Sequence, residues 1–143
     1  MHQKNLLSDR GVDRGVYISM SECLFCNIPR ERIISENNLS FAIRDNFPVT
    51  HLHSLIIPKR HVSEYFSLTE EEISSCNSLL NEIKDSITKE DDSVEGFNIG
   101  VNSGEVAGQT IFHCHIHLIP RREGDVENPT GGVRGVIPEK QQY

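Results

Sequence analysis

The chain has 143 residues, of which 36% are hydrophobic, so it can bury a core as one domain without disulfide bonds. Its net charge of -7 argues against sequence-independent nucleic-acid binding, which depends on clustered lysine and arginine. No apolar run reaches the length of a membrane span, and residues 1–22 lack the hydrophobic middle of a secretion signal. We therefore expect a cytoplasmic protein that binds neither nucleic acid nor membrane, with its four cysteines reduced.

Residues 1–21 mix charged and small polar residues without a sustained period, and we expect a flexible, dispensable leader. A C-x-x-C motif follows at Cys23 and Cys26. Alone it fits half of a zinc site, a redox pair or two buried cysteines. A thioredoxin-like redox pair would follow a core strand, and nothing before Cys23 has that pattern. A metal site is favoured, and it needs two further ligands.

Residues 32–46 predict two strands joined by a turn at Asn37-Asn38. Asp45 ends the second of these strands, where its role as a surface carboxylate or as a site residue stays open. Residues Leu52 to Pro58 predict a third, more central strand. His61 comes just after this strand, and a histidine at a strand end is well placed as a metal ligand.

From Thr69 the pattern changes to that of a helix. Thr69 and Glu72 form a capping box, and the three glutamates from Glu70 suit the positive end of a helix. One apolar stripe then predicts packing on the sheet: Ile73, Cys76, Leu79, Leu80, Ile83 and Ile87. Because Cys76 belongs to this stripe, we interpret it as a small core residue rather than a nucleophile.

Residues 97–102 alternate between apolar and polar side chains, which predicts a strand with Phe97, Ile99 and Val101 facing the core. Asn102 then faces the other way. A short loop of small residues follows, and strands joined in this way usually pair antiparallel. The pairing would bring Asn102 beside the beginning of the next strand.

Three of the seven histidines lie at alternate positions, His113, His115 and His117. A strand would place their imidazoles in one row, because alternate side chains of a strand face the same way. The intervening and following residues would form the opposite, apolar face: Cys114, Ile116 and Leu118. Neighbouring histidines would be roughly 7 Å apart, too far for one ion to bind all three, so each ring should meet a different group. A purely structural role is disfavoured, since it would bury polar rings needlessly.

Gly108, Gln109 and Thr110 precede this row and supply flexible backbone, an amide and a hydroxyl, which suit an anionic ligand. Such a ligand would also need basic side chains nearby, although a solvated surface is the ordinary place for each candidate. The candidates are Lys59, Arg60, Arg121, Arg122 and Arg134. Residues 123–143 form a turn-rich tail that could pack on its own domain or on a partner.

The sequence from Cys23 to Arg122 resembles the histidine triad superfamily, whose signature is His-x-His-x-His followed by two apolar residues. The segment His113 to Ile119 matches this signature, and the segment Leu55 to His61 is also similar to the family. The glycine that often precedes the residue matching His53 is Leu52 here. The resemblance implies an α+β fold, with an antiparallel meander and one long helix packed on it. It also implies a homodimer and a histidine triad domain over residues 22–122.

By the same resemblance, the protein acts on small nucleotides and cleaves them at the α-phosphate through a covalent nucleotidyl-histidine. His115 would be the nucleophile, since a neutral imidazole has a free lone pair. His117 would contact a phosphate oxygen, Gln109 would lie near the leaving oxygen, and His53 would orient the row. The implied substrate contacts are Asn102, Gly108 and Thr110 at the phosphate and Asp45 at the ribose.

Members of the superfamily with paired cysteines bind zinc, and four residues match that pattern here: Cys23, Cys26, His61 and His113. They give the Cys₂His₂ set of a tetrahedral structural zinc site. The resemblance therefore implies that Zn²⁺ ties the N-terminal segment to the histidine strand.

The segment Arg121 to Asp125 resembles the branch that cleaves diadenosine polyphosphates, which are therefore the first candidate substrates. A nucleoside phosphoramidate hydrolase and a phosphorylase are alternatives within the enzyme class. The rival from another class is a non-catalytic nucleotide-binding regulatory module, which has no need of His115. A zinc-only scaffold would leave His115 and His117 unexplained.

Overall fold

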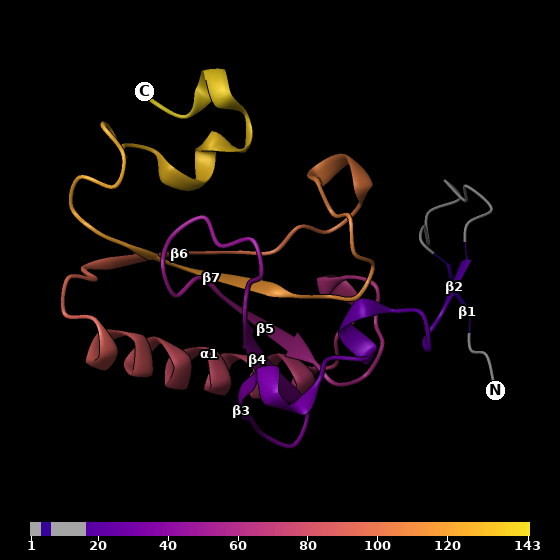
Figure 1. The fold of residues 1–143 in the computed structure, drawn as a ribbon. Helices are drawn as coiled ribbons and strands as arrows, with labels where there is room; N and C mark the ends of the chain where they lie inside the picture. The colour runs from indigo at the N-terminus through magenta and orange to yellow at the C-terminus, as the bar shows by residue number, and fades with distance from the viewer. Residues whose placement is uncertain (1–3, 7–16) are drawn as a thin grey trace.

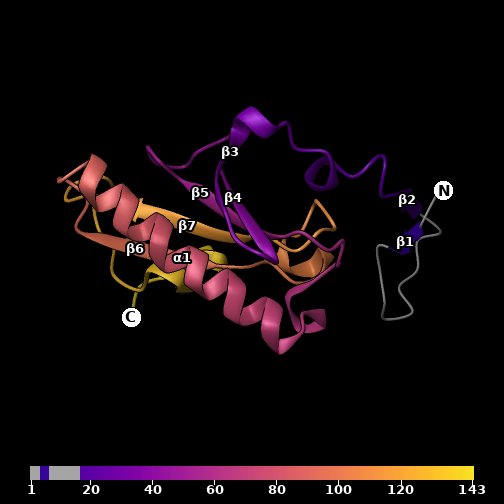
Figure 2. The same ribbon diagram turned by 90° about the horizontal axis from the view of Figure 1, so that it is seen from below.

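The computed structural model describes residues 4–6 and 17–143, and its main element is a five-stranded sheet. The strands are antiparallel throughout and follow the order β3-β4-β5-β7-β6. Their bounds are Ile33–Glu36 (β3), Ser40–Arg44 (β4), Ser54–Pro58 (β5), Gly96–Gly100 (β6) and Ile116–Arg121 (β7). One long helix, α1 (Glu70–Glu90), crosses one face of the sheet (Figures 1 and 2). The expected α+β fold, with one long helix on an antiparallel sheet, is confirmed. The sheet is not a simple meander, because β7 and not β6 lies beside β5.

A separate two-stranded ribbon pairs β1 (Lys4–Leu6) with β2 (Tyr17–Ser19). The rest of the expected leader, residues 1–3 and 7–16, lies outside the described residues. Short 3₁₀ turns complete the fold: η1 (Leu24–Cys26), η2 (Arg30–Arg32), η3 (Tyr65–Ser67), η4 (Glu105–Ala107), η5 (Gly132–Val136) and η6 (Pro138–Lys140). Within the described part of the chain, no helix combines the length and apolarity that a membrane crossing needs.

The two faces of the sheet pack against different partners, because alternate residues of a strand point to opposite sides. One face packs on the α1 stripe and contains Ala42, Ile56, Ile116 and Leu118. The other packs on the segment around η1 and contains Phe41, Ile43, Leu55 and Ile57. Strand register places His117 opposite Leu55, on this second face. The histidine site therefore lies on the side of the sheet away from the helix.

Helix α1 begins with the predicted capping box. The Thr69 hydroxyl accepts a hydrogen bond from the Glu72 amide at 3.1 Å, and the Glu72 carboxylate accepts one from the Thr69 amide at 2.9 Å. Cys76, Leu79, Ile83 and Ile87 are buried as expected. These contacts set where the helix begins and which of its faces the sheet covers.

Two residues that the apolar pattern assigns to the core are exposed: Ile73 by 37% and Ile99 by 51%. The reason is the position of β6 at the edge of the sheet, since α1 packs on β3, β4, β5 and β7 instead. Phe97 and Val101 do pack against the core. Ile73 and Ile99 both line an apolar cavity of about 350 Å³ beside this edge.

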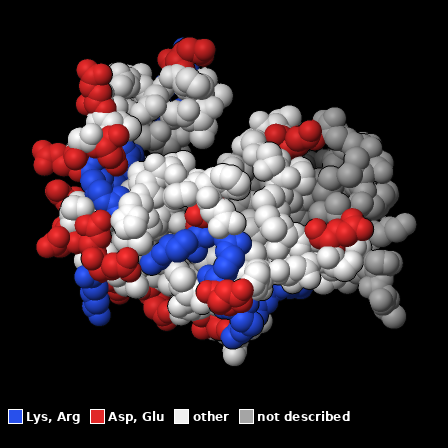
Figure 3. Space-filling view, viewed as in Figure 1, with Lys and Arg blue, Asp and Glu red and all other residues white. Residues whose placement is uncertain are grey.

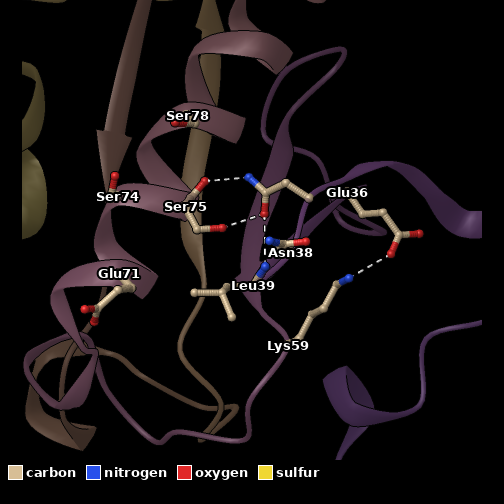
Figure 4. Close-up of a pocket in the computed structure, with 9 residues that line it drawn as sticks. Glu36, Asn38, Leu39, Lys59, Glu71, Ser74, Ser75 and Ser78 are labelled. Carbon is tan, nitrogen blue, oxygen red and sulfur yellow. Dashed lines mark hydrogen bonds and ion pairs between the residues drawn. The ribbon is translucent and has the colours of Figure 1, made fainter.

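The turn between β3 and β4 is tied to α1 by Asn37. Its amide donates to the Ser75 carbonyl at 2.9 Å (Figure 4), and its carbonyl oxygen accepts from the Ser40 amide at 3.0 Å. A polar groove of about 790 Å³ opens beside these contacts, with the 2.9 Å ion pair of Lys59 and Glu36 at its far side. Neither histidine nor cysteine lines this groove, so it lies apart from the chemistry suggested by the sequence.

Leu52 adopts φ 72°, the left-handed region that favours glycine, at the position where the resemblance leads one to expect glycine. Its side chain is only 8% exposed and packs in the α1 core. We expect Leu52→Ala to lower the free energy of unfolding by about 2–4 kcal/mol, since it removes the packing and keeps the strain. Leu52→Gly removes the side-chain packing and also the backbone strain, so it should be more stable than the alanine variant by about 1 kcal/mol. Urea unfolding of the two variants tests this, and an alanine variant at least as stable as the glycine variant would contradict it.

Candidate active site and metal centre

The histidine segment is only partly a strand. Strand β7 begins at Ile116, while residues 111–115 form bends and irregular backbone, so the expected strand is wrong for His113 and His115. The Cys114 amide donates to the Val62 carbonyl at 2.7 Å, outside the sheet ladder. The apolar side of the segment is as expected, because Cys114, Ile116 and Leu118 are buried.

The bend turns His113 toward the two cysteines of the C-x-x-C motif. Its Nδ1 lies 3.5 Å from the Sγ atoms of both Cys23 and Cys26. The Nδ1 of His61 lies 3.0 Å from Cys26 Sγ. The four donor atoms all lie within 4.8 Å of one another. Zinc bonds of about 2.3 Å to sulfur and 2.0–2.1 Å to nitrogen give a tetrahedral edge of roughly 3.5 Å, so this donor set fits the ion.

Further hydrogen bonding and burial at this cluster also suit a metal. His113 Nε2 donates to the Pro58 carbonyl at 2.8 Å, which leaves the Nδ1 lone pair facing the sulfurs. Burial lowers the pKa of His113 to about 4 and also lowers that of His61, so both rings are neutral at pH 7. Burial, together with the Cys23 thiol, raises the pKa of Cys26 to about 12. A bound cation would favour the thiolate that this burial otherwise disfavours.

A second chain of polar groups joins Asp45, His53 and His117. The Nδ1 of His53 accepts from the Val49 amide at 3.1 Å, so its proton is on Nε2. That nitrogen is 2.9 Å from His117 Nδ1 and 3.5 Å from the Asp45 carboxylate. His117 Nδ1 is then the acceptor, and its Nε2 carries a proton that can be donated to a ligand. Burial, with the neighbouring His115 and His53, lowers the pKa of His117 to about 4.

His115 lies between the metal cluster and this chain. Its Nδ1 donates to the His113 carbonyl at 2.8 Å, which leaves the Nε2 lone pair free. Burial lowers the pKa of His115, so the ring is neutral at pH 7. The ring centroid lies 5.2 Å from that of His117 and 4.9 Å from that of Phe25. The structure thus gives each of the three histidines a different partner, as their spacing indicates.

The loop before the histidines is held by Gln109, which is 2% exposed. Its amide donates to the carbonyls of Ser63 at 2.6 Å and Ile111 at 3.1 Å, and its oxygen accepts from the Gly104 amide at 2.9 Å. Gly108 adopts φ 96° at the end of η4. Thr110 is exposed and Asn102 is half-buried, on the same loop.

Two contributions to the site are not evident from the sequence. Phe25 lies against His115, and its only signal in the sequence is its place between the two cysteines. The carbonyls of His113 and Pro58 set two imidazole tautomers. Backbone groups leave no side-chain signal, so only the structure could reveal them.

The five basic side chains suggested for an anionic ligand all contact other groups of the protein. Lys59 pairs with Glu36, Arg60 with Glu72, Arg121 with Asp125, Arg122 with Asp91, and Arg134 with the Gln141 carbonyl and the Tyr143 ring. On the face drawn in Figure 3, lysine and arginine form only small groups, and acidic side chains gather toward the end where α1 finishes. These residues therefore do not provide the basic side chains that were expected beside an anionic ligand.

Comparisons with known proteins show which family the chain belongs to. The family model of the HIT domain matches residues 28–124. Adenylylsulfatase HINT3 of Arabidopsis thaliana is 38% identical over 109 residues, which cover 73% of this chain and 55% of that protein. The chain thus spans about half the length of this relative. Bis(5'-adenosyl)-triphosphatase of Dictyostelium discoideum is 37% identical over 101 residues, which cover 71% of this chain and 67% of that protein.

Solved structures show the same fold. A HIT family protein from Bacillus anthracis matches with a TM-score of 0.67 and 40% identity, over 73% of this chain and 76% of that one. A Zn-bound histidine triad family protein from Mycobacterium smegmatis matches with a TM-score of 0.68 and 30% identity, over 77% of this chain and 82% of that one. The fold and the family match agree, and the chain belongs to the HIT domain family.

Proposed function

We propose that this protein is a nucleotide hydrolase or nucleotidyl transferase that cleaves at an α-phosphate through a covalent bond to His115. The observation that carries the proposal is the hydrogen bond from His115 Nδ1 to the His113 carbonyl. It fixes the tautomer in which Nε2 has a free lone pair, and a buried neutral ring keeps that lone pair at pH 7.

In the proposed reaction, His115 Nε2 attacks the α-phosphorus, and the bond from phosphorus to the leaving group breaks with its electron pair on the leaving group. The His113 carbonyl holds the Nδ1 proton of the resulting imidazolium. Water then attacks the phosphorus, the bond from phosphorus to Nε2 breaks with its electron pair on Nε2, and a proton of the water passes to solvent, which restores the neutral ring. His117 donates its Nε2 proton as a hydrogen bond to a non-bridging phosphate oxygen, where charge develops. His53 and Asp45 keep His117 in the tautomer that can donate.

The remaining substrate contacts are part of the same proposal. Asn102, Gly108 and Thr110 belong to the loop beside the histidines and would bind the phosphate, and Asp45 would bind the ribose. Gln109 would lie near the leaving oxygen. Because its amide already makes three hydrogen bonds within the protein, it would have to exchange one of them or act by holding the loop in place.

Diadenosine polyphosphates are the first substrate candidates, supported by the relative named bis(5'-adenosyl)-triphosphatase. The relative named adenylylsulfatase adds adenylyl sulfate as a compound to test. Phosphoramidates and transfer to inorganic phosphate are the alternatives. Incubation with each substrate, with and without phosphate, and identification of the products distinguishes them. Tight mononucleotide binding without turnover of any candidate would instead favour a regulatory module.

We also propose a structural zinc ion held by Cys23, Cys26, His61 and His113. When bound, the ion would supply a tetrahedral cross-link between η1 and the segment that carries His115. The donor geometry and the Zn-bound relative support this assignment.

The neutral state of the histidines predicts a pH dependence. Because burial lowers the pKa of His115 below 6.5, kcat/KM should decline at acid pH with a midpoint below 6.5. The free energy of unfolding should also fall as pH decreases. His117 changes its pKa from 6.5 to about 4 on folding, so the unfolded chain binds more protons between these values. The contribution of His117 to stability is then complete above about 6.5 and is lost as pH falls toward 4. A pH–rate profile with its acid midpoint above 6.5 would contradict this.

A homodimer is proposed through the edge strand β6. Its support is the unpaired side of this strand and the exposed Ile99 and Ile73 beside an apolar cavity. Ile99→Asp should place a charge in that interface and halve the molar mass measured by light scattering. Val106→Asp, at a fully exposed position on η4, is the control that should leave the mass unchanged. A native protein with the mass of one chain would contradict the dimer.

A further inference from the structure

Phe25 lies between the two cysteines of the metal cluster and contacts the histidine proposed to react. It belongs to η1, with Cys23 just before this turn and Cys26 as its last residue, and it is 5% exposed. Its ring centroid is 4.9 Å from that of His115, with the planes at 67°, and 6.1 Å from that of His113, at 86°. Both are edge-to-face arrangements, which aromatic rings favour.

The environment of His115 shows why this contact matters. One hydrogen bond, from Nδ1 to the His113 carbonyl, sets the tautomer of the ring. A ring held by one hydrogen bond can still rotate about its side-chain bonds, which would move Nε2. His117 and Phe25 both contact the ring, with centroids at 5.2 Å and 4.9 Å. His117 is held in place by His53, which is not part of the metal cluster. Phe25 is held in place by η1, the turn that contains the cysteines, so its contact with His115 depends on that turn.

We propose that Phe25 is a positioning residue that couples the metal cluster to His115: an ion bound by Cys23 and Cys26 fixes η1, and η1 holds the Phe25 ring against the His115 imidazole. This inference rests on the proposed function, because it assigns the coupling to the same His115 chemistry. It adds a direct side-chain path to the backbone path from His113 to His115. When zinc is removed, the His115 ring should therefore lose its fixed orientation mainly because Phe25 no longer holds it.

The test compares native protein with Phe25→Leu, both with bound zinc, and then with zinc removed by a chelator. Phe25→Leu should keep its zinc and lower kcat about 10-fold, with KM changed by less than about 2-fold. Zinc removal should lower kcat about 10-fold in native protein but less than about 2-fold further in Phe25→Leu, since both changes interrupt one path. Phe41→Leu is the matched control. Phe41 is buried in the same cluster, and within the described residues it makes no ring contact with a histidine. This variant should keep the native response to zinc removal.

A readout without turnover separates this inference from the proposed function. The ¹⁵N NMR signals of the His115 ring in substrate-free protein should show one Nδ1–H tautomer in native protein and a mixture in Phe25→Leu. If native protein cleaves no nucleotide, the proposed function fails while the NMR comparison still tests the coupling. A single tautomer in zinc-loaded Phe25→Leu would overturn the inference. If neither Phe25→Leu nor Phe25→Met binds zinc, Phe25 assembles the metal centre instead, and the positioning role is also overturned.

Discussion

Replacement of His115 by alanine is expected to lower kcat for the best nucleotide substrate by at least about 10⁴-fold, because the proposed covalent step loses its nucleophile. The rest of the cluster should persist. The His113 backbone carbonyl loses its contact with His115, but the His113 ring nitrogens still face the cysteines and the Pro58 carbonyl. Zinc content and stability should therefore change little. Steady-state kinetics measure the loss. Mass spectrometry of rapidly quenched native protein should show a nucleotidyl adduct on the peptide that contains position 115.

His51→Ala is the matched control, because His51 is an exposed histidine two residues before His53. Its activity should equal that of native protein. A His115→Ala variant that keeps a tenth or more of native kcat, or that still forms the adduct, would show that another group performs the attack. An adduct that forms but does not turn over would point to transfer to an acceptor other than water.

Loss of the metal is expected to have the largest effect on stability. Cys26→Ser should remove bound zinc and lower the free energy of unfolding by about 3 kcal/mol or more, because the cross-link between η1 and the His113 segment is lost. The catalytic effect should be smaller, about tenfold in kcat, since His115 remains present but is less well held. Elemental analysis, chemical unfolding and kinetics on the same preparation measure all three quantities.

Cys76→Ala controls for the loss of a thiol from the core. Cys76 is buried on α1, away from the cluster, so this variant should lose about 1 kcal/mol of packing and retain zinc. The decisive comparison is with native protein stripped of zinc. Zinc-free protein that is as stable and as active as the loaded form would remove the structural role proposed for the ion.

The elements that the sequence predicts correctly have local signals. The beginning of α1 follows from two residues three apart, Thr69 and Glu72, whose side chains cap each other's backbone. Strands β3 and β4 follow from apolar residues and the Asn37-Asn38 turn. Each signal is confined to a few neighbouring residues, so no knowledge of distant contacts is needed to interpret it.

The errors have a common cause. Alternation predicted that Ile99 faces the core, but the position of β6 at the sheet edge leaves it exposed. Alternation also predicted a strand at His113 and His115, whereas contacts to Cys23 and Val62 bend the chain there. In both cases residues distant in sequence decide the outcome. Periodicity describes which residues could share a face, and the rest of the fold decides whether that face is covered.

The sequence by itself determined the family, because motif spacing is a property of the chain, and the α+β fold followed from the resemblance to that family. The same motifs marked the side chains that we propose for the chemistry. Only the tertiary structure decided which group each histidine contacts. The carbonyls of Pro58 and His113 and the amide of Val49 select the tautomers of His113, His115 and His53. The structure also placed Phe25 on His115 and paired the basic side chains elsewhere. Hydrogen-bond direction and burial depend on groups brought together from distant positions, and a linear sequence does not specify those distances.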